Sequence, residues 1–207
     1  MIRITTGMYK GRNIRIPAGI RPTQNLARKA IFDILGDIRG LLFLELYAGS
    51  GAVGIEAASR GAKEVVFVDN NSLVLRILSQ NLTHILNTAY SILPQDAQLA
   101  IKRLAEDNCK FDIIFFDPPY NQKLVPRLGS TTLITSRSES MVAASNDSLS
   151  KKTLQTLSAY DILSPAGLII AQHSKKESLP EHLGVLSLLK LSTYGNTSFS
   201  FYQNKAV

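Results

Sequence analysis

The sequence is poor in cysteine and has no long apolar run, and both features narrow the class of protein. Its 207 residues include one cysteine, Cys109, which cannot form an internal disulfide and fits a reducing compartment. Apolar runs such as 41–44 and 113–116 are far shorter than the roughly 18 residues that a membrane span requires. No apolar stretch of signal-peptide length follows Met1. We therefore expect a cytoplasmic protein without a membrane segment.

Charged residues make up only 19% of the chain, and their distribution is uneven. A hydrophobic fraction of 45% allows a buried core and excludes a wholly disordered chain. Of the net charge of +7, six units fall in residues 1–40, where eight basic residues outnumber Asp33 and Asp37. A basic arm on a nearly neutral body indicates an anionic partner, most often nucleic acid, although a merely solvated basic surface is the alternative. We predict an RNA-binding hairpin and helix over 1–40 and a second domain over 41–207.

The basic region divides into a hairpin and a helix. Residues 2–6 and 12–16 are β-prone and flank a glycine-bounded turn, which predicts a β-hairpin. A helix should begin after Thr23 as N-cap and end before Gly36. Helical periodicity places one set of side chains on its buried face: Leu26, Ala27, Ala30, Ile31, Ile34 and Leu35. The same periodicity turns another set to solvent: Asn25, Arg28, Lys29 and Asp33.

Strand and helix patterns alternate through the rest of the chain. Strands are predicted over 41–47, 64–69, 90–93, 111–117 and 167–172. Helices are predicted over 52–60, 73–86, 97–106 and 154–163. This order predicts an α/β fold with a doubly wound, mostly parallel, Rossmann-like sheet. Segments 185–191 and 198–202 are predicted to form an antiparallel hairpin at the sheet edge. The serine-rich composition of segment 127–152 predicts a flexible insert.

A glycine-rich turn joins the first of these strands to the next helix. Residues 45–54, ELYAGSGAVG, contain G-x-G-x-x-G after a strand and before a helix, which is the context in which this pattern indicates a nucleoside-containing cofactor. Asp69 follows Gly49 by 20 residues, at the end of the second strand, where a carboxylate accepts hydrogen bonds from ribose hydroxyls. The candidate cofactor-binding residues in these two segments are Glu45, Ala48, Gly49, Ser50, Gly51, Asp69 and Asn70.

Acidic residues around this turn bear on the kind of cofactor. Dinucleotides and S-adenosyl-L-methionine (SAM) share the glycine-loop geometry. Glu45 ends the first strand, and Asp96 follows the third. Because SAM carries a cationic sulfonium and an ammonium group, an acid-rich crevice favours it over a pyrophosphate without deciding between them.

A second motif follows the strand 111–117. Asp117, Pro118, Pro119 and Tyr120 form D-P-P-Y at the carboxyl end of that strand, where ligands bind in such sheets. Prolines fix their own φ angles and lack an N–H donor, so the segment is stiff and presents acceptors. The Asp117 carboxylate and the Pro118 carbonyl are placed to hold an exocyclic base amine, and Tyr120 to stack on an extruded base.

With these motifs, the chain resembles the bacterial 16S ribosomal RNA (guanine-N2) methyltransferases over nearly its whole length. The resemblance rests on the basic hairpin followed by R-P-T at 21–23, the glycine turn, Asp69, Asn81-Leu82, Asp96-Ala97, D-P-P-Y and the segment 194–197. The chain departs from the family pattern at Leu26 and Lys29, where those enzymes usually carry arginine and glutamate.

The resemblance implies a fold, an activity and partners. It implies a SAM-dependent enzyme that methylates N2 of one guanine in small-subunit ribosomal RNA, naked or in a partly assembled 30S particle. Asp96 and Ala97 would border the adenine of SAM, and the enzyme would act as a monomer. The arm would grip RNA through a set of polar residues: Lys10, Arg12, Arg15, Arg21, Thr23 and Arg28. No metal is expected, because the histidines and Cys109 lack ligand spacing.

Three alternative functions stay open at this point. An adenine-N6 nucleic-acid methyltransferase would share the D-P-P-Y chemistry, and a protein-glutamine methyltransferase would usually carry asparagine in place of Asp117. A non-catalytic RNA-binding assembly factor would keep the basic arm but need neither motif. Binding of SAM separates this last alternative from the enzymes.

Overall fold

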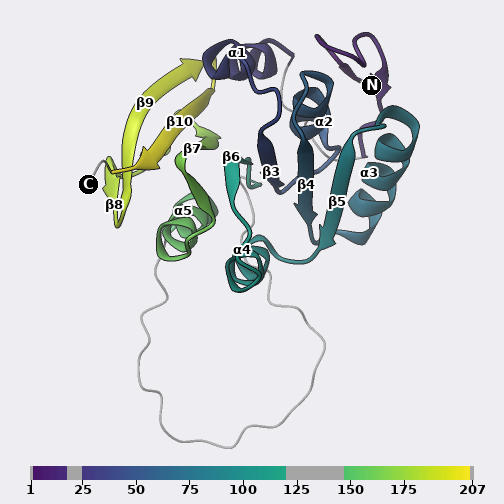
Figure 1. Cartoon of the computed structure of the whole chain (residues 1–207). Coiled ribbons are helices and arrows are strands. Elements are labelled where there is room, and N and C mark those ends of the chain that lie inside the picture. The colour runs from purple at the N-terminus through teal and green to yellow at the C-terminus, as the bar shows by residue number, and fades with distance from the viewer. Residues whose placement is uncertain (1, 18–24, 120–146, 206–207) are drawn as a thin grey trace, which may run out of the picture.

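The computed structural model describes residues 2–17, 25–119 and 147–205. Figure 1 shows its helices and strands. In chain order they are β1 (Ile2–Arg3), β2 (Asn13–Ile14), α1 (Asn25–Leu35), β3 (Leu42–Leu46), α2 (Ala52–Ser59), β4 (Glu64–Asp69), α3 (Ser72–Ile85), β5 (Ala89–Pro94), α4 (Ala97–Glu106), β6 (Phe111–Phe116), α5 (Leu149–Ala159), β7 (Leu163–Ser174), β8 (His182–Leu183), β9 (Leu186–Tyr194) and β10 (Thr197–Asn204).

Eight strands form the main sheet, in the order β5-β4-β3-β6-β7-β10-β9-β8. The first five are parallel, and β10 runs antiparallel to both β7 and β9. The prediction of a doubly wound, mostly parallel sheet with an antiparallel C-terminal hairpin is therefore confirmed. The short strand β8 at the outer edge, paired with β9, was not predicted.

Both faces of the parallel sheet are buried, because successive side chains on a strand point to opposite faces. On β4, Val65 and Phe67 pack into one apolar cluster with residues of α1, α2 and α3. Val66 and Val68 pack into a second cluster with residues of α4 and α5. In Figure 1, α2 and α3 accordingly lie apart from α4 and α5. The parallel strands are thereby held between two apolar layers.

The N-terminal arm, residues 2–17, packs on the first of these layers. Ile4, Tyr9 and Ile14 are buried in the cluster that contains the α2 and α3 side chains. The predicted hairpin is present, but its paired strands β1 and β2 have only two residues each. The division at residue 40 stays a prediction about function, because the arm and the body share one apolar core.

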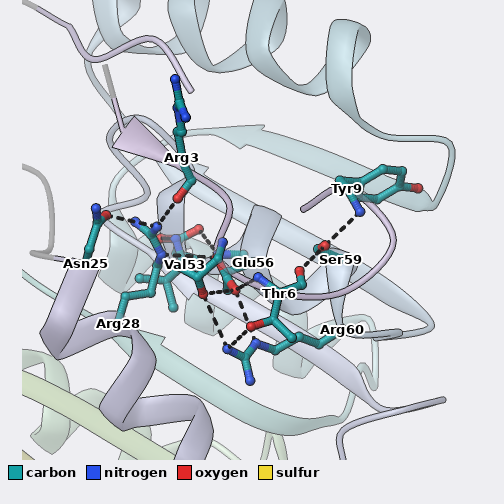
Figure 2. Close-up of polar contacts among 12 residues, drawn as sticks. Arg3, Thr6, Tyr9, Asn25, Arg28, Val53, Glu56, Ser59 and Arg60 are labelled. Carbon is teal, nitrogen blue, oxygen red and sulfur yellow. Dashed lines mark hydrogen bonds and ion pairs between the residues drawn. The ribbon is translucent and has the colours of Figure 1, made fainter. Parts of the chain in front are cut away.

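A buried carboxylate on α2 attaches the arm to the rest of the protein. Glu56 is fully buried and accepts hydrogen bonds from the backbone N–H groups of Thr5 (2.9 Å) and Thr6 (3.0 Å). The Nε atoms of Arg28 and Arg60 each lie 3.3 Å from its oxygens. Figure 2 shows Glu56 at the centre of these contacts. The hydroxyl of Thr5 also donates to Glu56, so five groups from three segments converge on one side chain.

The buried face of α1 differs from the predicted one. Leu26 is 72% exposed, whereas Arg28 and Phe32 are almost completely buried. The guanidinium of Arg28 is tolerated there because it pairs with Glu56 and donates to the carbonyl of Arg3. The prediction that Arg28 faces solvent and contacts RNA is therefore wrong. Burial lowers the pKa of Arg28, and the charge of Glu56 opposes this effect.

The segment after the D-P-P-Y motif ends earlier than predicted. Ser148 is an N-cap, since its side chain accepts a hydrogen bond from the backbone N–H of Lys151, and α5 begins at Leu149. Residues 148–152 are therefore capped helix and not part of a flexible insert, and the helix predicted over 154–163 is shifted towards the N-terminus. Residues 127–146 of the predicted insert lie outside the described residues, as do Arg21, Thr23 and Tyr120. Within the described ranges, no helix is long and apolar enough to cross a membrane.

Candidate cofactor and catalytic site

The glycine loop after β3 is tied to the end of β4. The N–H of Ala48 donates to the carbonyl of Val68, and the N–H of Gly49 to Oδ2 of Asp69, each at 2.9 Å. Gly51 has a φ of +75°, and a Cβ atom there would lie 2.5 Å from Leu78. Both the conformation and the close approach require glycine at this position. The loop is thus held between β4 and α3.

Asp69 is half-buried at the carboxyl end of β4. Its second oxygen accepts from the N–H of Asn71 at 3.0 Å, and the neighbouring Asn70 is exposed. Each carboxylate oxygen has two lone pairs, so both oxygens can still accept a hydrogen bond from a ribose hydroxyl. The structure brings Asp69 to Gly49 as the spacing of the motif indicates, and cofactor binding by these residues stays a prediction.

Glu45 lies beneath the glycine loop and is only 3% exposed. Its oxygens accept from the N–H groups of Val53 (3.3 Å) and Gly54 (2.8 Å) at the start of α2. A Cβ atom on Gly54 would lie 2.7 Å from this carboxylate and 2.5 Å from Phe67, so the third glycine of the motif allows α2 to approach the sheet. Burial raises the pKa of Glu45 to about 8; the two N–H donors oppose the shift, and the charges of Asp117 and Asp69 add to it.

This shift makes a prediction about stability and pH. A carboxyl whose pKa is raised by folding stabilises the native state fully below its ordinary pKa of 4.5, and this contribution is lost as pH rises towards about 8. Urea unfolding of wild type should therefore show a loss of a few kcal/mol across this window relative to Glu45→Gln. Glu106→Gln, at an exposed carboxyl, is the control. If the difference in free energy of unfolding between wild type and Glu45→Gln does not change with pH, the prediction is contradicted.

Asp96 and Ala97 lie at the start of α4. The Asp96 side chain caps this helix, because Oδ1 accepts from the N–H groups of Gln98 (2.9 Å) and Leu99 (3.4 Å). Ala97 is buried. The capping role was missed in the sequence, where the acid was interpreted only as a cofactor ligand. A place for both residues at the adenine stays a prediction.

One buried polar atom at this edge lacks a protein partner. The Nε2 atom of Gln95, directly after β5, is buried and has no hydrogen-bond partner among the residues that the structure describes. A buried unsatisfied amide is costly, and such groups are often satisfied by a ligand or water. Gln95 directly precedes Asp96, and it follows the strand end that is paired with Asp69 of β4. The residues present therefore fit a nucleoside with acceptor atoms. Sequence reasoning missed Gln95.

Asp117 is half-buried at the carboxyl end of β6, and its Oδ2 accepts a hydrogen bond of 2.6 Å from Nε2 of Gln172. Gln172 belongs to the neighbouring strand β7 and is 5% exposed. Pro118 is buried and Pro119 exposed. The parallel register of β6 and β7 brings the two side chains together. Sequence reasoning did not identify Gln172, because only strand pairing reveals this neighbour.

Among the candidate RNA-binding residues that the structure describes, Lys10 and Arg12 share one turn of the arm, and Arg15 follows it. Tyr9 packs against the amino-terminal end of β5, where its hydroxyl lies 3.0 Å from Oγ1 of Thr88. Lys10 and Arg12 are exposed in the same turn. Because this turn packs at the amino-terminal end of β5, both residues lie near the edge of the sheet opposite to Asp117. The Nη1 atom of Arg12 donates to the carbonyl of Ile85, the last residue of α3, at 2.8 Å. The guanidinium of Arg12, like that of Arg28, therefore has a hydrogen-bond partner within the protein.

Arg15 lies closer to the glycine loop than this turn does. Its side chain is exposed, and its backbone is held by Asn81, which also contacts Ser50 of the loop. Among Lys10, Arg12 and Arg15, it is therefore the one best placed towards the candidate cofactor site. No group of three potential metal ligands occurs in the described part of the chain.

The protein is similar to several named methyltransferases. It is 30% identical to the "Putative rRNA methyltransferase YlbH" of Bacillus subtilis over 99% of this chain and 100% of that protein. It is 26% identical to the "Ribosomal RNA small subunit methyltransferase D" of Haemophilus influenzae over 98% of this chain and 94% of that protein.

Solved structures share the fold. A hypothetical protein of Thermus thermophilus superposes with a TM-score of 0.75 at 26% identity, with 98% of this chain and 99% of that chain covered. A protein of 18% identity, solved in complex with SAH, covers 89% of this chain and 50% of that chain with a TM-score of 0.63, which supports the fold alone. A family model described as "Conserved hypothetical protein 95" matches residues 2–142. From this match and the end-to-end similarity to the Bacillus protein, we conclude that the chain belongs to the conserved hypothetical protein 95 family and is a methyltransferase.

Proposed function

We propose that the protein is a SAM-dependent methyltransferase that acts on the exocyclic N2 amine of a guanine in small-subunit ribosomal RNA. The observation that carries the proposal is the position of Asp117. Its carboxylate is held by Gln172 and precedes two prolines. It shares its edge of the sheet with the glycine loop.

Asp117 and Pro118 would hold the target amine. The amine lone pair of guanine is delocalised into the ring, so the nitrogen is a poor nucleophile. Hydrogen bonds from its N–H groups to the Asp117 carboxylate and the Pro118 carbonyl favour the pyramidal, nucleophilic form and orient the nitrogen. A fixed pair of acceptors contributes through orientation and preorganised electrostatics.

The glycine loop, Asp69 and Gln95 would hold the cofactor. SAM, when bound, supplies an activated methyl group, so the protein has to position the amine and exclude competing nucleophiles. Asp69 offers acceptors for the ribose hydroxyls, and Nε2 of Gln95 a donor. The acids Asp69 at the end of β4 and Asp117 at the end of β6 give this edge negative potential, which suits a cationic ligand.

The substrate assignment rests on the basic arm and on the relatives. Six of the seven net positive charges lie in residues 1–40, and the Haemophilus relative is named for the small ribosomal subunit. We place the reaction in the cytoplasm, with one copy of the protein acting on 16S RNA, naked or in a partly assembled 30S particle.

Mass mapping of modified nucleosides tests this function. Ribosomal RNA from cells without the gene should lack one N2-methylguanosine of the small subunit, and a plasmid copy should restore it. Loss of an N6-methyladenosine instead would favour the adenine-N6 enzyme. An unchanged set of methylated nucleosides would contradict an RNA substrate.

A further inference from the structure

Asn81 on α3 connects the arm to the glycine loop. It is 3% exposed, and its side-chain amide makes three hydrogen bonds to backbone groups. Oδ1 accepts from the N–H of Arg15 at 3.0 Å, while Nδ2 donates to the carbonyls of Arg15 (2.9 Å) and Ser50 (3.0 Å). One side chain therefore satisfies both backbone groups of an arm residue and one carbonyl of the loop.

Among the described residues, the arm and the glycine loop have no hydrogen bond between them except through Asn81. The loop is held to β4 through Ala48 and Gly49, so the bond to Ser50 holds it from the opposite side, against α3. A change in the position of the loop at Ser50 acts directly on the amide of Asn81, and through it on Arg15. A buried amide cannot release one partner cheaply, because each unsatisfied group costs about 1–3 kcal/mol.

We propose that Asn81 is a positioning residue that couples occupancy of the cofactor site to the order of the arm at Arg15. The inference rests on the proposed function, since it requires a cofactor at the glycine loop and RNA at the arm. A bound cofactor restrains the loop and, through Asn81, the backbone of Arg15, whose exposed side chain is then presented to RNA. By thermodynamic linkage, RNA that restrains Arg15 raises the affinity for the cofactor by the same factor.

Hydrogen exchange of the Arg15 amide tests this coupling, because that N–H donates to Asn81. The probe is SAH, which binds without reaction. In the wild-type protein, saturating SAH should slow exchange of the Arg15 amide several-fold, as measured by residue-resolved NMR. The matched control is Thr83→Ala, an exposed residue two positions further along α3, which should behave like wild type.

Two variants of Asn81 separate attachment of the arm from coupling. Asn81→Asp keeps an acceptor for the Arg15 N–H but lacks the donor to the carbonyls of Arg15 and Ser50. The Arg15 amide should therefore stay protected and no longer respond to SAH. Asn81→Ala loses all three bonds. Its SAH affinity, measured by calorimetry, should fall about tenfold relative to Thr83→Ala, as expected for loss of about one buried hydrogen bond.

The outcomes are distinguishable. If SAH binds the wild-type protein and the Arg15 amide does not respond, the coupling is disproved while the proposed function stands, and this holds even if Asn81→Ala does not fold. An SAH response of the Arg15 amide that persists in Asn81→Asp would also overturn the proposal. Failure of the wild-type protein to bind SAH would contradict the proposed function itself, and the coupling with it.

Discussion

Replacement of Asp117 by alanine is expected to abolish methyl transfer and to leave SAM binding within a few-fold of wild type. The carboxylate accepts a hydrogen bond from Gln172 on one oxygen and would accept from the target amine as well. Because the effect of a preorganised polar group falls on the transition state, we expect a loss of roughly 10³-fold in kcat. The measurement is transfer of labelled methyl groups to 16S RNA from a strain without the gene, with calorimetry for SAM.

Two further variants define the role of the carboxylate. Asp117→Asn keeps one acceptor oxygen and should retain part of the activity. Asp107→Ala removes an exposed carboxylate at the end of α4 and should be indistinguishable from wild type. Turnover of Asp117→Ala within about tenfold of wild type, far less than loss of a preorganised donor or acceptor normally costs, would show that the amine is held elsewhere.

Glu56→Ala is expected to destabilise the protein more than Asp117→Ala or Asp107→Ala. The change removes the acceptor for two backbone N–H groups of the arm and leaves Arg28 as a completely buried charge without its counterion (Figure 2). Breaking a buried ion pair on one side costs about 3–5 kcal/mol. Urea unfolding of Glu56→Ala should therefore show a loss of this size.

A matched variant and a double-mutant cycle test the cause. Glu106→Ala removes an exposed glutamate and should change stability by less than about 0.5 kcal/mol. The double variant Arg28→Met/Glu56→Gln removes both charges. Its loss of unfolding free energy should therefore be smaller than the sum of the losses of the single variants Arg28→Met and Glu56→Gln. Additive losses would mean that the ion pair is not what stabilises the arm.

The strands of the sheet could be predicted from the sequence because each depends on a local pattern of residues. The buried strands are short apolar runs between helical patterns, and the predicted and observed limits of β4 and α4 coincide. The family resemblance is confirmed for the same reason, since its motifs are continuous stretches of chain. The glycine turn and Asp69 meet as predicted.

The buried face of helix α1 could not be predicted from the local sequence pattern. Periodicity places leucine inside and arginine outside, but the partner that permits Arg28 to be buried is Glu56, 28 residues away. The acid Asp96 was assigned to a ligand, whereas the structure shows that it caps its own helix. An aspartate directly before a helix is a local N-cap signal, so the capping role of Asp96 could have been predicted. For Arg28, the local sequence does not identify the distant partner that permits burial.

Composition and short-range pattern were thus sufficient for most strands and helices in chain order, the family and the two motifs at the carboxyl edge of the sheet, because these depend on residues that are neighbours in the chain. The tertiary structure alone decided that Arg28 is a buried ion-pair partner, that Gln172 holds Asp117, and that Asn81 joins the arm to the loop. These contacts join residues 28 to 66 positions apart. Their free energy comes from satisfying buried polar groups, a requirement that arises only once the chain has folded.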